Sequence, residues 1–136
     1  MRDPRRMICF VIYNCTKPNP PVYKPGLHLL IDFKADSELL SDMEGYRRCI
    51  NELIHEYQLQ AIGDVYHAFD GAGFTAITCL TESHVSIHTW PEYNRATFDV
   101  FLSNYLRVND RTAQSICDKV LAFFQAEITQ KTEVKR

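Results

Sequence analysis

Residues 81–92, with the sequence TESHVSIHTWPE, combine several side-chain types that catalytic sites use. They hold two of the five histidines, the only tryptophan, two serines and two glutamates. Histidine exchanges protons near neutral pH, serine becomes a nucleophile beside a base, and carboxylates bind hydroxyl groups. This density of reactive groups favours a functional segment over an ordinary strand.

Three common chemistries fit the segment poorly. His84 and His88 have the spacing of a helical zinc motif, but Val85 takes the place of the general-base glutamate and the β-branched neighbours favour a strand. The chain has neither a G-x-S-x-G turn nor a glycine-rich phosphate loop. We therefore expect no metal, and residue types and spacing alone leave a small enzyme or a binding module open.

Besides the string ESHVSIHTWPE, the chain contains three further motifs: GLHLLIDF at 26–33, HAF at 67–69 and TFDVFLSNYL at 97–106. In this order the four motifs resemble the small prokaryotic S-adenosylmethionine decarboxylases. The resemblance implies a proenzyme that cuts itself between Glu82 and Ser83. It also implies decarboxylation of S-adenosylmethionine for spermidine and other polyamines.

By this resemblance the Ser83 hydroxyl attacks the Glu82 carbonyl, the amide becomes an ester, and elimination cuts the chain. Residue 83 is left as a pyruvoyl group, a covalent cofactor that condenses with a substrate amine. His88 matches the histidine that moves protons during self-cleavage, and Thr75 stands where the family usually has a second serine. Ser83 and His88 would face opposite sides of a straight strand, so we predict a bend or a bulge between them. We expect His84 to be structural.

The resemblance also assigns residues to the substrate. Phe69 matches the aromatic ring that stacks on adenine, Glu92 matches the carboxylate that binds the ribose hydroxyls, and Val85 is a further substrate-binding candidate. Ser103 stands where the family has a cysteine that reprotonates the decarboxylated carbon. A thiol has a pKa near 8.5, whereas an alkyl hydroxyl is a far weaker acid.

Ser103 therefore keeps two alternatives open. One is a relative adapted to ornithine or arginine, and the other is a non-catalytic paralogue that pairs with a complete decarboxylase. The family's small members form dimers with composite sites, so the resemblance implies a homodimer of processed protomers.

The pattern of apolar residues predicts the elements that position these side chains. Strands are expected at 27–34, 61–69, 74–81 and 95–103, with a hairpin turn at 70–73 and a β-prone tail at 127–134. A capping box of Ser41 and Glu44 predicts one helix, and Asn109 or Asp110 begins another. Residues 83–92 are left unassigned. This order predicts an α+β two-layer sandwich, with a mixed or antiparallel sheet and two helices on one face.

Composition limits the remaining possibilities. A chain of 136 residues with 46% hydrophobic residues predicts one folded domain, which we place at 26–136 after a leader and proline-rich linker at 1–25. A net charge of −2 argues against nucleic acid, and the longest apolar run, residues 7–13, is too short to span a membrane. Five scattered cysteines favour reduced thiols in the cytoplasm.

Overall fold

Six strands form one antiparallel sheet in the order β2-β3-β4-β5-β1-β6. The computed structural model describes residues 19–136. In chain order the elements are β1 (Leu27–Lys34), α1 (Ser37–Ser41), α2 (Met43–Glu56), β2 (Ala61–Ala68), β3 (Phe74–Leu80), β4 (Ser83–Trp90), the 3₁₀ turn η1 (Pro91–Tyr93), β5 (Arg95–Leu102), α3 (Asp110–Phe123) and β6 (Glu127–Lys135). The predicted α+β sandwich is confirmed, and its sheet is antiparallel rather than mixed.

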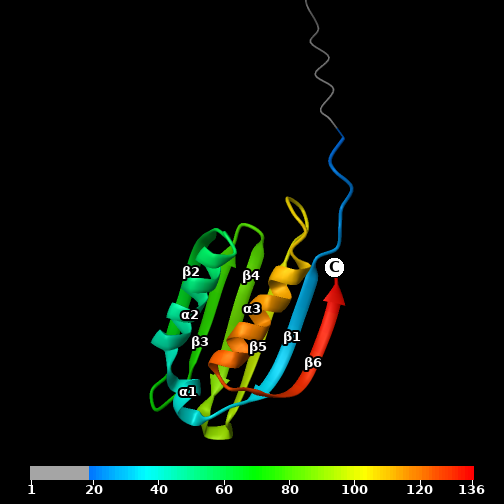
Figure 1. Cartoon of the computed structure of the whole chain (residues 1–136). Coiled ribbons are helices and arrows are strands. Elements are labelled where there is room, and N and C mark those ends of the chain that lie inside the picture. The colour runs from blue at the N-terminus through cyan, green and yellow to red at the C-terminus, as the bar shows by residue number, and fades with distance from the viewer. Residues whose placement is uncertain (1–18) are drawn as a thin grey trace, which may run out of the picture.

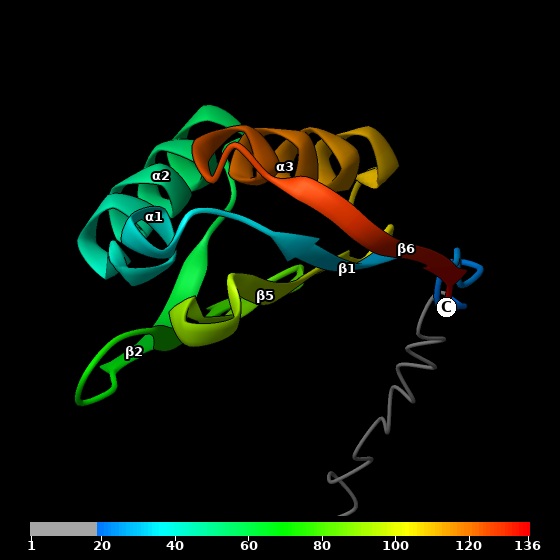
Figure 2. The same cartoon turned by 90° about the horizontal axis from the view of Figure 1, so that it is seen from below.

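All three α-helices cover the same face of the sheet (Figures 1 and 2). The opposite face carries no helix within residues 19–136, and we call it the open face. Strand residues alternate between the two layers, as Leu29 and Ile31 show by being buried against the helices. The prediction of two helices on one face is thus confirmed, with the short α1 as an addition.

The unassigned segment 83–92 forms β4 and the start of η1, and β4 lies between β3 and β5. The mixture of polar and apolar residues hid this strand, because its open face carries His84, Ser86 and His88 while Val85 and Ile87 join the core. The chemistry-bearing segment is therefore held by hydrogen-bonded neighbours on both sides.

The predicted capping box at Ser41 is wrong. Asp42 caps α2 by accepting a hydrogen bond from the Gly45 amide at 2.8 Å, and the Ser41 hydroxyl instead donates to the Ser37 carbonyl within α1. A Cβ at position 45 would lie 2.0 Å from an Asp42 carboxylate oxygen, so glycine makes room for the cap. The helix itself extends to Glu56, as its apolar spacing predicts.

The segment after α3 belongs to the sheet. The predicted tail forms β6, which pairs with β1, and the Gly26 amide donates to the Arg136 carbonyl at 2.8 Å. Residues 19–26 form neither helix nor strand. The predicted leader falls mostly on residues 1–18, which lie outside the described residues.

Candidate functional site

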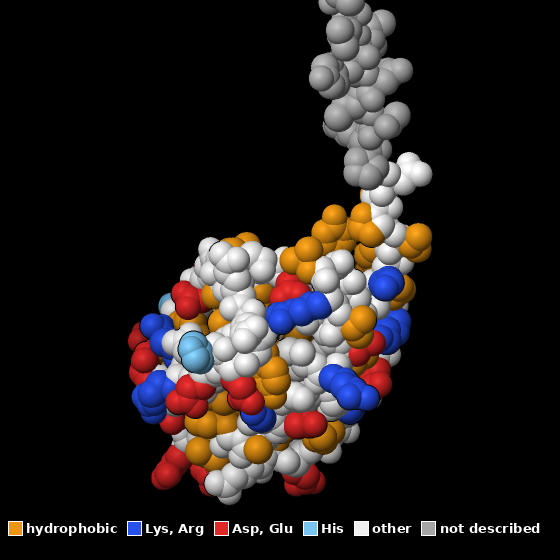
Figure 3. All heavy atoms as spheres, turned by 45° about the horizontal axis from the view of Figure 1, so that its top comes forward, with side chains coloured by type: hydrophobic (Ala, Val, Ile, Leu, Met, Phe, Trp, Pro, Cys, Tyr) orange, Lys and Arg blue, Asp and Glu red, His pale blue; other side chains and the backbone are white. Residues whose placement is uncertain are grey.

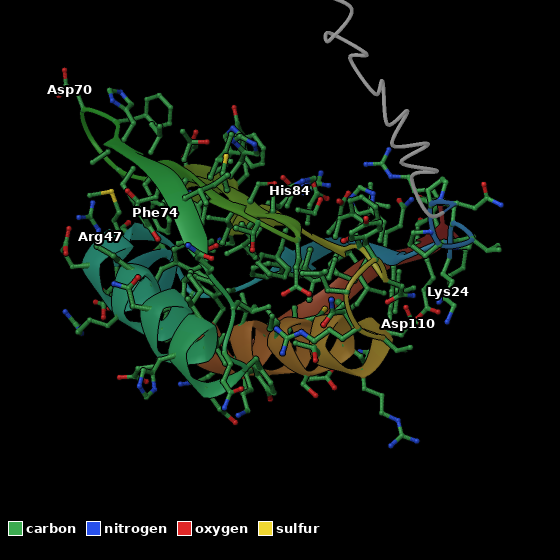
Figure 4. All side chains as sticks on the ribbon, turned by 90° about the horizontal axis from the view of Figure 1, so that it is seen from above. Lys24, Arg47, Asp70, Phe74, His84 and Asp110 are labelled. Carbon is green, nitrogen blue, oxygen red and sulfur yellow. The ribbon has the colours of Figure 1, made fainter. Side chains whose placement is uncertain are left out.

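Ser83 has an unusual backbone at the start of β4. Its φ of 139° lies in a region that L-residues rarely adopt, and such a conformation costs about 1–3 kcal/mol. Its Oγ lies 3.3 Å from Nδ1 of His84, a histidine on the open face (Figure 4). The strain thus lies at the residue that the resemblance assigns to chain cleavage.

We predicted a bend or a bulge between Ser83 and His88, and the bulge is wrong. Both ladders of β4 run from residue 83 to residue 88 without a shift in register. The irregularity is instead at Ser83 itself, whose hydroxyl contacts a side chain of the open face in spite of its position in the alternation.

The preceding residue, Glu82, is buried and its carboxylate accepts three hydrogen bonds. Only 7% of it is exposed, and its two carboxylate oxygens accept hydrogen bonds from Arg107 Nε at 3.2 Å and Nη2 at 2.9 Å. Asn109 Nδ2 donates a third at 2.8 Å. Burial raises the pKa of the Glu82 carboxyl, but these hydrogen bonds and the charge of Arg107 outweigh it and hold the pKa below its ordinary value. Glu82 is therefore a clamped carboxylate.

Ser103 lies against the Glu82 main chain. Its amide donates to the Glu82 carbonyl oxygen at 2.8 Å, and its own carbonyl accepts from Asn109 Nδ2 at 2.7 Å. A donor at this distance polarises the carbonyl and stabilises negative charge that develops on its oxygen. We call Glu82, Ser83, His84, Ser103, Arg107 and Asn109 the Ser83 cluster.

The segment after β5 supplies three members of this cluster, and it exposes apolar side chains while it buries a polar one. Asn109 is buried, whereas Tyr105, Leu106 and Val108 are each more than 60% exposed. Apolar side chains appear on this upper end of the molecule in Figure 3. Arg107 and Asn109 were not predicted as site residues, because no local pattern in the sequence indicates that a polar side chain of a loop turns inward.

A second group lies at the far end of β4. His88 Nδ1 is hydrogen-bonded to Thr75 Oγ1 across the β3–β4 ladder, so these two predicted processing residues are in direct contact. The His88 ring also lies 6.3 Å, between centroids, from the ring of Trp90.

The two residues assigned to the adenosyl part of the substrate, Phe69 and Glu92, lie at the same end. Phe69 and Glu92 line one pocket of about 280 Å³, which Trp90 also lines. A neighbouring pocket of about 660 Å³ is lined by Trp90, Tyr93, Arg95 and Thr97. We call Thr75, His88, Phe69, Trp90 and Glu92 the His88 cluster. Val85 is only 2% exposed and belongs to the core, so its side chain lies away from the pockets.

The two clusters are separated along one strand. His88 follows Ser83 by five positions, which in a strand corresponds to about 17 Å at about 3.3 Å per residue. Trp90 is about 23 Å from Ser83 by the same measure. In a single chain the two clusters therefore lie apart along β4, and we call each of them a candidate half-site.

A buried histidine adjoins the Ser83 cluster. His28 on β1 is 8% exposed, and its ring meets the His84 ring edge-on with 5.8 Å between centroids. Within residues 19–136 its Nε2 has no hydrogen-bond partner. Burial and then the charge of Arg136 lower the pKa of His28, although Asp99 acts in the opposite direction. The sequence analysis did not assign a role to His28.

Two further features of residues 19–136 concern membranes and metal ions. None of the helices there has the length and apolar character that crossing a membrane requires. In the same residues no three His, Cys, Asp or Glu side chains are grouped so as to hold a metal ion.

Comparison with known proteins gives a consistent result. The sequence profile described as S-adenosylmethionine decarboxylase matches residues 27–136. The S-adenosylmethionine decarboxylase proenzyme of Thermodesulfovibrio yellowstonii is 31% identical over 116 residues, covering 85% of this chain and 83% of that protein. The proenzyme of the same name from Archaeoglobus fulgidus is 38% identical over 77 residues, or 56% of this chain and 69% of that protein.

The fold agrees as well. The crystal structure of the adenosylmethionine decarboxylase from Aquifex aeolicus matches with a TM-score of 0.69 and 26% identity. The match covers 84% of this chain and 90% of that one. On the profile, the relatives and the fold together, this chain belongs to the S-adenosylmethionine decarboxylase family.

Proposed function

We propose that this protein is a self-cleaving proenzyme that decarboxylates S-adenosylmethionine and so serves spermidine and polyamine synthesis. The observation that carries the proposal is the strained Ser83, placed between a clamped Glu82 and a histidine. The cut falls between Glu82 and Ser83.

The surroundings of the bond suit an attack by the serine on the preceding carbonyl. The Ser103 amide is already 2.8 Å from the Glu82 carbonyl oxygen, where negative charge would develop. The clamp on the Glu82 side chain limits the movement of the acyl group, and the unfavourable φ of Ser83 is a source of strain that cleavage relieves. Each of these contacts favours the attack of Ser83 on the Glu82 carbonyl, and this first step of self-cleavage needs no reagent from outside the protein.

The fold also tolerates the cut. Thr81 and Glu82 form the whole connection between β3 and β4, while Ser83 pairs with Leu80 on one side and Leu102 on the other. After cleavage, Glu82 remains bound to Arg107 and residue 83 remains between two strands. A pyruvoyl group at residue 83 supplies a ketone that condenses with an amine and accepts the electrons of the breaking bond to the carboxylate.

The adenosyl part of the substrate fits the other half-site. Phe69 offers a half-exposed ring for stacking, and Glu92 shares its pocket as an acceptor for ribose hydroxyls. Since the Ser83 cluster lies about 23 Å away along β4, the substrate of one chain cannot reach both half-sites at once.

A homodimer resolves this separation. The open face carries the exposed apolar side chains of Val65, Ile77 and Trp90. A two-fold axis across this face reverses the direction of β4 in the second copy, which brings the Ser83 cluster of one chain to the His88 cluster of the other. The dimer then holds two complete sites, and burial of the open face contributes its stability.

The cysteine side chains bear on the cellular location. Cys49, Cys79 and Cys117 carry free thiols, and Cys79 is exposed. Free thiols of this kind suit a reducing compartment, which supports a cytoplasmic protein.

Intact mass spectrometry of the purified full chain tests the cleavage. We expect fragments 1–82 and 83–136, the second beginning with a ketone that reacts with phenylhydrazine, and we expect Ser83→Ala to remain whole. The matured protein should release carbon dioxide from S-adenosylmethionine more readily than from ornithine or arginine. A wild-type chain that stays whole for days would contradict the proposal, and release from ornithine or arginine instead would favour the alternative substrates.

Mixing two inactive chains tests the shared site. Ser83→Ala cannot be cut and keeps His88, whereas His88→Ala keeps Ser83, so neither chain should mature alone. In a co-expressed pair with different tags, we expect the His88→Ala chain to be cut, because its partner supplies the histidine. If the pair stays whole, or if His88→Ala matures by itself, the shared site is wrong.

A further inference from the structure

The hydroxyl of Ser83 has a hydrogen-bond contact with one side chain, Nδ1 of His84 at 3.3 Å. The two residues are neighbours, so this contact exists within a single chain and needs no second copy. His88, which the family resemblance assigns to proton handling, is about 17 Å away in the same chain. The group closest to the reacting hydroxyl is thus His84 and not His88.

We propose that His84 is the proton acceptor for the first step of self-cleavage, a role that rests on the function proposed above. As Ser83 Oγ bonds to the Glu82 carbonyl carbon, the hydroxyl proton passes to His84 Nδ1. The carbon–nitrogen bond then breaks, the same proton passes to the Ser83 nitrogen, and the amide has become an ester. No atom is gained or lost in this isomerisation.

The electrophile is prepared by the opposite side of the cluster. The Ser103 amide stabilises the oxygen of the attacked carbonyl, and Arg107 and Asn109 hold the Glu82 side chain. Nucleophile, base and oxyanion donor therefore lie around one peptide bond, which is the arrangement that acyl transfer requires.

His28 is the positioning residue for His84. The rings of His28, His84 and Phe101 pack together, with centroids 5.4 to 6.1 Å apart, and the Arg136 guanidinium covers the Phe101 ring at 4.7 Å. His28 Nε2 is buried without a partner in residues 19–136. The edge-on packing of the His28 ring against the His84 ring limits how the His84 ring can turn beside Ser83. Figure 4 shows His84 on the side of the sheet away from the helices.

Two different histidines therefore act in the two steps of self-cleavage. His84 serves the conversion of amide to ester, and His88 of the second copy serves the elimination that cuts the ester. The division makes the two histidine variants stop at different stages. Hydroxylamine separates these stages, since it cleaves esters rapidly and amides slowly.

The test follows maturation of the full chain with His84→Gln and His84→Ala, using His55→Gln on an exposed turn of α2 as the matched control. We expect both His84 variants to mature at least about 100-fold more slowly, because positioned proton transfer contributes about 10²–10⁴-fold. The uncut chain should resist hydroxylamine. Imidazole in solution should restore part of the rate to His84→Ala. The control should mature normally.

His88→Ala should instead accumulate a chain that hydroxylamine cuts at residue 83. Maturation of His84→Gln at the wild-type rate would overturn the inference, as would accumulation of a hydroxylamine-sensitive chain in that variant. The melting temperature of His84→Gln should match that of the wild type; if His84→Ala alone is unfolded, His84→Gln gives the answer. A wild-type chain that fails to mature contradicts the proposed function, whereas normal maturation without His84 contradicts only this inference.

Discussion

We propose that the main chain and the side chain of Ser103 take part in different reactions. The amide contacts the Glu82 carbonyl, a contact that serine and cysteine make equally well. The side chain, in contrast, is assigned to proton donation after decarboxylation, where a hydroxyl is a much weaker acid than a thiol. Self-cleavage and turnover should therefore respond differently to this position.

We expect Ser103→Cys to leave the rate of self-cleavage unchanged and to raise the rate of carbon dioxide release from S-adenosylmethionine by about tenfold or more, within the range of positioned proton transfer. Ser41→Cys, on the exposed α1, is the matched control. No gain at all in a fully matured protein would favour the non-catalytic paralogue.

Glu92 offers a second test at a single residue. Its carboxylate shares a pocket with Phe69, and a hydrogen bond to a charged group contributes about 1.5–3 kcal/mol. Glu92→Gln should weaken binding of an adenosyl ligand by about tenfold or more. Isothermal titration measures the change, with Glu52→Gln on the exposed side of α2 as control. Equal affinities for the two variants would remove the ribose assignment.

At the scale of elements, the start of α2 separates what a motif predicts from what the backbone uses. Asp42 accepts the Gly45 amide, while Ser41 belongs to α1. Asp42→Ala should lower the free energy of unfolding by about 1 kcal/mol, and Ser41→Ala should leave it nearly unchanged. Urea unfolding monitored by circular dichroism compares the two. The reverse order of effects would restore the capping box.

The connection between β3 and β4 makes the protein sensitive to acid. The pKa of Glu82 lies below its ordinary value of 4.5 in the folded chain, so the carboxylate stabilises the fold at neutral pH and this contribution is lost as the pH falls through the folded pKa. In the uncut Ser83→Ala chain, Glu82→Gln should cost about 1–3 kcal/mol at pH 7.

Glu82→Gln should also flatten the decline of stability below about pH 4.5. Urea unfolding across pH 3 to 7 measures both effects, and Glu133→Gln on the exposed β6 is the control. An unchanged pH dependence would mean that the Arg107 clamp adds nothing to folding.

At the scale of the whole molecule, the proposed dimer depends on the open face. Ile77→Glu places a charge in the middle of this face without disturbing the core, since Ile77 is 41% exposed. We expect a monomer by analytical ultracentrifugation and a large loss of maturation, whereas Arg48→Glu on the helical face should change neither. A fully maturing Ile77→Glu monomer would contradict a site shared between two chains.

The family, the two-layer architecture and most of the elements could be predicted from the order of amino acids alone. Alternation in 27–34 and 95–103 and the apolar stripes of two helices are local patterns that survive folding unchanged. The motif residues from Thr75 to Glu92 could likewise be recognised in the sequence, because such a density of reactive side chains is unusual in any segment.

Which of those residues lie together could not be predicted in this way, because it depends on the folded arrangement of the strands and loops. Ser83 and His88 are five residues apart in one motif, yet an extended strand separates them into two half-sites. Arg107 and Asn109 meet Glu82 from a distant loop, and His28 meets His84 from another strand. Contacts between distant segments depend on strand order and on how loops turn inward, and neither leaves a local pattern in the sequence.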